Sequence, residues 1–289
     1  MAVPAALSPS ALCLLLCTAL VAPATAPTAQ AATVIEEPTP QGAVGFVVIR
    51  ENGSGSASSA QRYLDSLFTG IARTNGWPAA AGKYFTKRSK AVPYIKDTKP
   101  SFGFLSFGAY LGLRKDHELR PLAVADASAS GGAQYFLVSR DHVTLDACKG
   151  KALATNHASD RRYLDRVVSG DAFALADFEV VETRRPVQTL KAVIDGEAAC
   201  ALVDDSQIVA MSKVDGGHML RPVWSSEKLP AVVVVSFGTA AGEHLESFTS
   251  HLEAICDGDG RATCDAAGLK APRRLEADAF AAQQAAYDR

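Results

Sequence analysis

The feature of this sequence that most constrains the fold is an apolar segment that leads through a Gly/Ser-rich loop into an amphipathic helix. Residues 42–49 (GAVGFVVI) are apolar almost throughout, which is typical of a strand buried on both faces of a parallel sheet. The turn-rich residues 51–56 follow, and apolar residues then recur at spacings of three and four until Asn75-Gly76 ends the helix. Its apolar face consists of Ala60, Leu64, Leu67, Phe68 and Ile71. This order of strand, loop and helix predicts the first half of a βαβ unit.

The same alternation continues to residue 237. The expected strands are residues 102–107, 119–125, 133–139, 151–155, 178–181, 199–203 and 231–237. The expected helices are residues 109–113, a segment through Tyr163 to Val168, a helix from Pro186 to Gly196 that buries Val187, Leu190 and Ile194, and one from Asp205 onward. Alternating strands and helices indicate mainly parallel sheets with helices on both faces. The expected strands are too many for one compact sheet with so few long helices. We therefore predict an α/β fold of two lobes.

The first thirty residues have the pattern of an export signal. Residues 12–22 (LCLLLCTALVA) form an apolar run. The run is too short for a membrane-spanning helix, which needs about 20 residues. The small-x-small pattern at residues 29–31 predicts a signal peptide over residues 1–31, a mature chain from about Ala32 and a periplasmic location. Residues 1–10 contain no Lys or Arg, so a misassigned start codon, or an uncleaved signal that anchors the chain in the membrane, stays open.

Cysteine usage agrees with export. Four cysteines follow the signal, and an even number permits disulfides in an oxidising compartment. Cys256 and Cys264 flank a short polar segment that can turn back on itself, so we predict a bridge between them. Cys148 and Cys200 form either a second bridge or two buried thiols. No metal site is predicted, because no Cys-x-x-Cys or His-x₃-His spacing accompanies the cysteines.

The charge balance argues against a nucleic-acid partner. The 289 residues contain 29 Lys and Arg against 31 Asp and Glu, a net charge of −2, with no basic block. Binding to nucleic acid needs a concentrated basic surface. We therefore expect no nucleic-acid partner.

The first loop has the composition and position of an anion-binding site. Residues 53–59 (GSGSASS) follow the first expected strand and open its helix, where backbone N–H groups and the helix dipole favour a negative ligand. Ser54, Ser56 and Ser58 are the expected ligand-binding residues there. The alternative is a flexible turn with a serine N-cap.

A second loop takes the same strand-to-helix position later in the chain. Residues 155–161 (TNHASDR) offer Asn156, His157 and Ser159 as hydrogen-bonding residues, with arginines at 161 and 162 beside them. The alternative is an N-cap followed by exposed arginines. Facing lobes would bring both loops onto one ligand.

Common catalytic motifs do not occur in the sequence. It contains no Gly-x-Ser-x-Gly elbow, Walker motif, Gly-x-Gly-x-x-Gly or His-Glu-x-x-His. Residues 257–260 (DGDG) lack the other ligands of an EF-hand calcium loop. We therefore predict neither enzymatic activity nor a cofactor.

Residues 100–126 (PSFGFLSFGAYLGLRKDHELRPLAVAD) resemble a stretch of type 2 periplasmic binding proteins of the phosphonate/phosphite transporter class. Further segments resemble the same family in the same order, so that the resemblance covers roughly residues 40–255. They are AQYFLVSRD, LDACKGKALATN with Cys148 at the place of a Leu, LKAVIDGEAACALVDD and VWSSEKLPAVVVV. Each segment is weakly specific, and the ordered set is considerably more so.

The resemblance implies two α/β lobes, each a mainly parallel sheet with flanking helices, joined by a two-strand hinge. Lobe one takes residues 33–134 and 225–289, and lobe two takes residues 135–224. The implied function is capture of a phosphonate-, phosphate- or sulfonate-like solute by closure of a monomer, which delivers it to an inner-membrane ABC permease. A ligand-sensing accessory module of the same fold, acting in signalling, is the alternative function.

The chain departs from the family in the second loop. The family has a Ser/Thr run that ends in Gly there, whereas residues 156–160 read NHASD. Pro186 stands near the place of a family His, behind two arginines that can replace hydroxyls as partners of an anion. The resemblance therefore implies an anion site without specifying phosphonate. Further expected ligand-binding residues are Ser106, Tyr110, Arg185 and Asp204.

Overall fold

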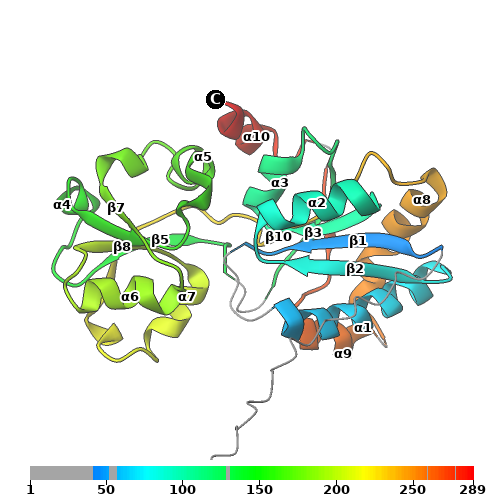
Figure 1. Ribbon diagram of the computed structural model, residues 1–289, viewed down its shortest axis with the longest axis horizontal. Coiled ribbons are helices and arrows are strands. Elements are labelled where there is room, and N and C mark those ends of the chain that lie inside the picture. The colour runs from blue at the N-terminus through cyan, green and yellow to red at the C-terminus, as the bar shows by residue number, and fades with distance from the viewer. Residues whose placement is uncertain (1–41, 52–56, 128–130, 259, 277) are drawn as a thin grey trace, which may run out of the picture. The chain divides into compact units, whose positions relative to one another are not determined.

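The computed structural model describes residues 42–51, 57–127, 131–258, 260–276 and 278–289, and residues 39–289 form one compact unit (Figure 1). The expected signal peptide and the loop residues Ser54 and Ser56 lie outside the described residues. Ser58 belongs to the first helix, but its side chain is also outside them. The fold is a mixed α/β arrangement of two sheets with flanking helices, as the sequence predicts.

The first sheet has six strands in the order β11-β4-β10-β3-β1-β2. They are β1 (Val44–Ile49), β2 (Ala80–Phe85), β3 (Phe102–Leu105), β4 (Arg120–Ala125), β10 (Val232–Ser236) and β11 (Arg273–Arg274). The strands β2, β1 and β3 pair in parallel, whereas β10 runs antiparallel between β3 and β4. Four of the six strands therefore point the same way, and the late strand β10 lies between strands from the first half of the chain.

Helices cover both faces of this sheet (Figure 1). One face carries α1 (Ala57–Asn75), α8 (Gly242–His251), the 3-10 segment η5 (Leu252–Cys256) and α9 (Gly260–Ala267), and the other carries α2 (Arg88–Thr98), α3 (Phe107–Leu113) and α10 (Ala281–Asp288). Alternate residues of β1 are buried on both sides, Phe46 toward α1 and Val47 toward α2. The predicted apolar face of α1 is confirmed, because Leu64, Leu67, Phe68 and Ile71 are all buried and only Ala60 is partly exposed.

The second sheet has five strands in the order β7-β6-β8-β5-β9. They are β5 (Tyr135–Ser139), β6 (Ala152–Thr155), β7 (Glu179–Glu182), β8 (Cys200–Asp204) and β9 (Arg221–Ser225). Only β5 runs against the other four. Its helical segments are α4 (Leu145–Cys148), η1 (Ala158–Asp160), α5 (Arg161–Tyr163), η2 (Leu164–Val168), η3 (Leu175–Asp177), α6 (Pro186–Ile194), α7 (Asp205–Met211) and η4 (Gly217–Met219).

The chain passes between the two sheets after β4 and again after β9. Strands of the first sheet come from residues 44–125 and 232–274, and strands of the second come from residues 135–225. The helix α10, at the end of the chain, contacts η2 of the second sheet as well as the core around α3. The bounds of the two lobes as separate domains stay a prediction.

Several elements were missed in the sequence, and one expectation of burial was wrong. The pair β2 and α2 was not predicted, because the strand sequence AAGKYF has no clear alternation and Pro93 stands inside the helix. The strand β9 was also missed. Val187 is 47% exposed, contrary to expectation, because Pro186 begins α6 and the buried face uses Leu190 and Val193 instead.

Two disulfides occur among the described cysteines. Cys256 and Cys264 are bridged, which confirms the prediction from their spacing. Cys148 and Cys200 are bridged as well, with their Cα atoms 6.1 Å apart, and this settles the choice between a bridge and two thiols. The second bridge ties α4 to β8 inside the core of the second sheet.

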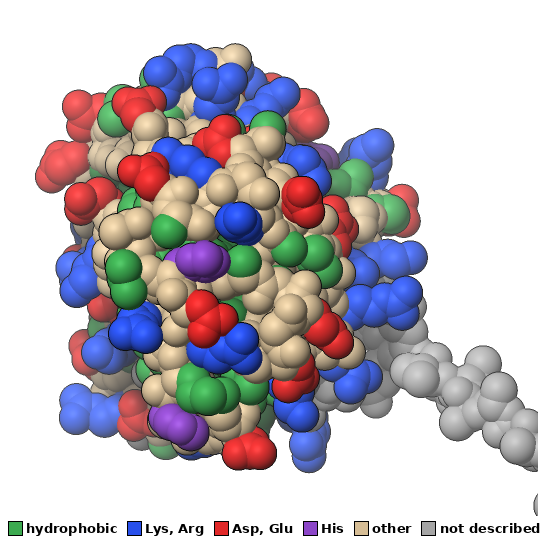
Figure 2. All heavy atoms as spheres, turned by 90° about the vertical axis from the view of Figure 1, so that its left-hand side faces the viewer, with side chains coloured by type: hydrophobic (Ala, Val, Ile, Leu, Met, Phe, Trp, Pro, Cys, Tyr) green, Lys and Arg blue, Asp and Glu red, His purple; other side chains and the backbone are tan. Residues whose placement is uncertain are grey.

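The face that carries the second sheet has an interspersed charge pattern. Figure 2 shows Lys and Arg beside Asp and Glu over most of that face, with a group of Lys and Arg at its upper edge. Hydrophobic side chains are scattered singly there. Within the described residues, no helix combines the length and apolar character needed to cross a membrane, and no group of His, Cys, Asp and Glu is arranged to hold a metal ion.

Candidate ligand-binding site

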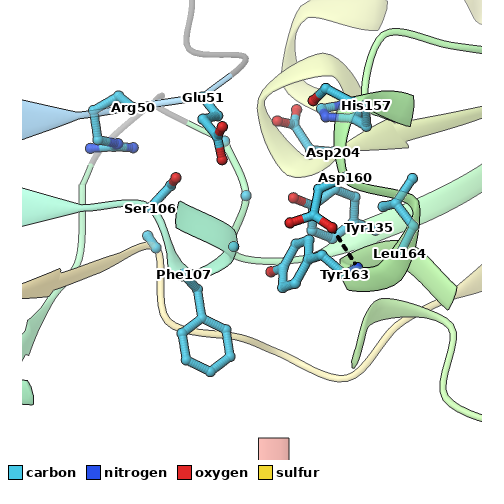
Figure 3. Close-up of a pocket in the computed structure, with 15 residues that line it drawn as sticks. Arg50, Glu51, Ser106, Phe107, Tyr135, His157, Asp160, Tyr163, Leu164 and Asp204 are labelled. Carbon is cyan, nitrogen blue, oxygen red and sulfur yellow. Dashed lines mark hydrogen bonds between the residues drawn. The ribbon is translucent and has the colours of Figure 1, made fainter. Parts of the chain in front are cut away.

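A small cavity lies where the carboxyl ends of several strands from both sheets meet (Figure 3). From the first sheet it is lined by residues that follow β1 and β3, and from the second by residues that follow β6 and β8 together with the start of β5. Its volume is about 30 Å³, which is enough for roughly two water molecules. Ligands of open α/β sheets bind at such strand ends. The polar side chains that line it are Arg50, Glu51, Ser106, Tyr135, His157, Ser159, Asp160, Tyr163 and Asp204.

An arginine between two carboxylates connects the two sides of the cavity. Arg88, the first residue of α2, lies 2.7 Å from a Glu51 oxygen and 2.9 Å from an Asp160 oxygen. Glu51 follows β1, whereas Asp160 belongs to η1 in the second sheet. Desolvation by burial on its own would lower the pKa of Arg88, but the charges and hydrogen bonds of Glu51 and Asp160 together outweigh it and raise the pKa. The guanidinium therefore stays charged and joins the two sheets.

The loop after β6 places a buried histidine at the cavity. The His157 side chain is only 4% exposed, and its Nε2 lies 2.8 Å from Oε1 of Gln207 on α7. The His157 backbone N–H donates to Thr155 Oγ1 at 3.1 Å, which fixes the turn that follows the strand. The ring of Tyr135 stands edge-on to the imidazole at 5.3 Å between centroids. Nδ1 of His157 is buried and has no hydrogen-bond partner among the described residues.

On the opposite side of the cavity, Ser106 carries a second polar atom without a partner. Ser106 is the N-cap residue of α3, but its side chain makes no capping hydrogen bond. Its backbone N–H donates to the Ile49 carbonyl at 2.8 Å, which holds the residue beside the end of β1. The buried Oγ finds no partner in the described part of the chain. Buried polar atoms are normally paired, so Ser106 and His157 both call for an explanation.

Two tyrosines form the floor beneath the histidine. Burial raises the pKa of Tyr135 well above its ordinary value and also raises the pKa of Tyr163. The ring of Tyr163 packs edge-on against Phe107 of the first sheet, with centroids 6.3 Å apart. The floor is therefore uncharged at neutral pH and continuous with the hydrophobic core.

The charges around the cavity are nearly balanced. Arg50 and Arg88 are the cations, while Glu51, Asp160 and Asp204 are the carboxylates, which leaves one formal negative charge. Desolvation lowers the pKa of Arg50, and Tyr84 and Asp204 oppose that shift through their charges. Asp204 is buried, and its Oδ1 accepts from the backbone N–H of Gln207 and the hydroxyl of Ser206.

A larger cleft of about 630 Å³ lies next to this cavity and shares Glu51 and Ser159 with it. Asn156 lines the cleft, and its Oδ1 accepts a hydrogen bond from Thr189 at 3.0 Å. The remaining lining comes from the start of α2 and the end of β7. Arg88 lines the cleft and forms ion pairs with Glu51 and Asp160, which line the small cavity.

Known proteins resemble this chain in fold and not in sequence. A scan against protein-family models finds no match, and a search of curated proteins finds none either. A Xanthomonas citri protein with a bound chloride ion gives a TM-score of 0.66 at 12% identity over 85% of this chain and 97% of that chain. The binding protein component of an ABC phosphonate transporter from Pseudomonas aeruginosa gives 0.59 at 10% identity over 82% and 83%. The periplasmic aliphatic sulphonate binding protein SsuA from Escherichia coli gives 0.57 at 12% identity over 86% of both chains.

This chain has the fold of type 2 periplasmic binding proteins. The two-sheet architecture that the sequence predicts is thereby confirmed. Identities of 10–12% establish the fold, so the ligand has to be argued from the site itself.

Within the periplasmic-binding-protein fold, some of the predicted ligand-binding residues come together and others do not. The small cavity collects Ser106, His157, Ser159 and Asp204. Tyr110 is buried behind it, where its hydroxyl accepts from Gln284 at 2.9 Å. The side chains of Asn156 and Arg185 lie elsewhere, the first in the adjacent cleft and the second exposed at the N-cap of α6. Ser54, Ser56 and Ser58 stay predictions outside the described side chains.

Sequence reasoning missed several residues of this candidate site. Arg50 and Glu51 directly follow the apolar strand β1, and that position alone is a signal. Gln207 forms a capping box with Asp204, three residues earlier, and this pattern is readable in a sequence. Arg88 belongs to the unpredicted α2, so nothing in the sequence connected it to Asp160.

Proposed function

We propose that this protein is a non-catalytic, extracytoplasmic solute-binding protein that captures a small anionic solute and delivers it to an inner-membrane ABC permease. The observation that carries the proposal is the pair of buried atoms Ser106 Oγ and His157 Nδ1. They belong to residues of different sheets, both residues line one cavity, and neither atom has a partner among the described residues. A buried polar atom without a partner costs roughly 1–3 kcal/mol. A solute that bonds to both atoms would remove that cost and link the two sheets.

The fold supports binding and delivery as the role. Binding proteins for a phosphonate transporter and for aliphatic sulphonates share this architecture. Anion capture also agrees with the cations beside the cavity, since Arg50 lines it and Arg88 borders it. Arg50 lies on the same side of the cavity as the Ser106 hydroxyl, which has no partner among the described residues (Figure 3), and Arg88 comes from α2 on the first sheet.

The charge balance restricts which anions are suited to the site. With three carboxylates around two guanidinium groups, a doubly charged anion would experience net repulsion at short range. A singly charged anion experiences about half of this repulsion, and a zwitterionic solute experiences the least. The preferred ligand is therefore a singly charged phosphonate-, phosphate- or sulfonate-like solute.

Capture would proceed by movement of two lobes about the segments that follow β4 and β9. Lobe one would comprise residues 33–134 and 225–289, and lobe two residues 135–224. Contacts such as Arg88 to Asp160 and Phe107 to Tyr163 join the two parts. A ligand bonded to both parts would add to these contacts and favour the closed arrangement.

The test is a thermal-unfolding screen of the mature protein with phosphate, methylphosphonate, aminoethylphosphonate and methanesulfonate, and with glucose as an uncharged solute. At a hundredfold excess over Kd, a ligand of the native state stabilises it by about 2.7 kcal/mol. Ser106→Ala removes one hydrogen bond to the ligand and should weaken binding about tenfold. Ser212→Ala, at an exposed position after α7, is the matched control. A shift with glucose and with none of the anions would contradict the proposal.

Periplasmic location belongs to the same proposal. The apolar run at residues 12–22 and the cleavage pattern at residues 29–31 predict export and removal of residues 1–31. N-terminal sequencing of protein recovered from the periplasm should therefore start near Ala32. Cytosolic protein that starts at Met1 would contradict this part of the proposal.

A further inference from the structure

We infer that the ligand must donate a hydrogen bond to His157, so that the site selects solutes that keep an O–H or N–H group over anions whose oxygens are all bare. This inference rests on the proposed function and narrows its ligand class. It follows from the hydrogen bonds around Gln207, which determine which ring nitrogen of His157 carries the proton.

The amide of Gln207 has one orientation that suits its backbone neighbours. Its Nε2 donates to the Pro186 carbonyl oxygen at 3.1 Å, and its Oε1 accepts from the Asp204 backbone N–H at 3.2 Å. A carbonyl only accepts and a backbone N–H only donates. Exchanging the amide oxygen and nitrogen would therefore break both contacts.

This orientation fixes the roles of the two His157 nitrogens. Nε2 lies 2.8 Å from Gln207 Oε1, which is an acceptor, so Nε2 must carry a proton. In the neutral imidazole, Nδ1 then offers only a lone pair. The residue is 4% exposed and lines the cavity, and Nδ1 has no partner among the described residues. A ligand that satisfies this atom has to supply the hydrogen.

The two carboxylates on this side of the cavity are acceptors as well, whereas the hydroxyls of Ser159, Tyr135 and Tyr163 can donate or accept. The carboxylates of Asp160 and Asp204 stand with His157 on the side of the second sheet, whereas Arg50 and Ser106 stand on the side of the first (Figure 3). A bound solute is thus expected to direct bare oxygens toward Arg50 and Ser106 and a donor toward His157.

This arrangement separates two anions of nearly equal shape. Singly charged methylphosphonate keeps one P–OH group, which can donate to Nδ1. Methanesulfonate has three bare oxygens and would place a lone pair against that of Nδ1. Sites that bond a hydroxyl of their ligand reject analogues without it, because the buried partner is left unpaired.

The experiment compares the Kd values of methylphosphonate and methanesulfonate by calorimetry at one pH. The wild type should prefer methylphosphonate at least tenfold, which corresponds to about one additional hydrogen bond. His157→Leu should bring the ratio close to one, mainly through loss of methylphosphonate affinity. His218→Leu, at an exposed position of η4, should leave the ratio unchanged.

A second readout does not depend on the folding of a variant. Nitrogen-15 NMR of the wild-type His157 ring should show the proton on Nε2 and a change at Nδ1 when methylphosphonate is added. In Gln207→Leu, the two tautomers should mix and the ratio of Kd values should fall. Equal wild-type affinities for the two anions, or a proton on Nδ1 in the complex, would overturn the inference and leave anion binding standing. If neither anion binds, the proposed function fails, and the inference fails with it.

Discussion

The guanidinium of Arg88 lies 2.9 Å from the carboxylate of Asp160, an ion pair that joins α2 of the first sheet to η1 of the second. The hydroxyl of Tyr287, in the C-terminal helix, donates to the same Asp160 oxygen at 3.0 Å. Arg88 and Tyr287 lie 72 and 127 positions from Asp160 in the sequence, and both bond to its carboxylate beside the candidate site. Asp160 also caps its own helix by accepting from the backbone N–H of Tyr163 at 2.9 Å.

The first prediction concerns this ion pair. Arg88→Gln leaves two partly buried carboxylates without their cation and should lower the free energy of unfolding by about 1–3 kcal/mol. Urea unfolding measures the change. Lys90→Gln, at an exposed position of the same helix, should stay within about 0.5 kcal/mol of the wild type. Equal effects of the two substitutions would show that the bridge contributes nothing specific.

The second prediction concerns the C-terminal helix. Tyr287→Phe removes the hydrogen bond to Asp160 and should destabilise the protein by about 1 kcal/mol. The ring itself remains, so its contacts with Arg114 and Arg162 persist. Tyr63→Phe serves as the control, because Tyr63 is 47% exposed. The comparison uses urea unfolding, and an unchanged midpoint for Tyr287→Phe would argue against the contact.

The third prediction concerns the disulfides. The bridge between Cys148 and Cys200 closes a loop with a separation of 52 residues, and that between Cys256 and Cys264 one of 8. Loop-closure entropy then predicts losses of about 4 and about 2.6 kcal/mol when each pair is replaced by Ala. Mass mapping of a non-reduced digest should show both links. Free alkylation of either pair in native protein would contradict the assignment.

The fourth prediction concerns alkaline pH. Burial raises the pKa values of Tyr135 and Tyr163, so the folded protein holds these protons more tightly than the unfolded chain. The stability they contribute is complete below the ordinary pKa of about 10 and is lost as pH rises above it. Absorbance at 295 nm should show their ionisation only together with unfolding followed by circular dichroism. Tyr163→Phe should reduce the amplitude of that step. Ionisation of both tyrosines in the folded protein would contradict the prediction.

The sequence predicted the fold well where apolar patterns are long. The strand at residues 44–49 and the helix with Leu64, Leu67, Phe68 and Ile71 follow directly from hydrophobic periodicity. Periodicity failed for β2 and α2, since the strand contains Gly82 and Lys83 and the helix contains Pro93. Tertiary packing on β1 makes these elements regular, and no local signal reports that packing.

The candidate site was less accessible to sequence reasoning. The position after an apolar strand pointed to the loop with His157 and Ser159, and both residues line the cavity together with Ser106 and Asp204. Their role in ligand binding stays a prediction. The pairing of His157 with Gln207 spans 50 residues, and that of Arg88 with Asp160 spans 72. Such contacts depend on how the elements pack in three dimensions. Tyr110 was predicted to bind the ligand, whereas its side chain is buried in the core and its hydroxyl accepts a hydrogen bond from Gln284.

The most direct test of the central claim is a crystal structure of the mature protein with the anion that gives the largest thermal shift. The account predicts that the anion lies in the small cavity, within hydrogen-bonding distance of both Ser106 Oγ and His157 Nδ1. An anion bound only in the larger cleft beside Asn156, or anywhere away from both atoms, would contradict it.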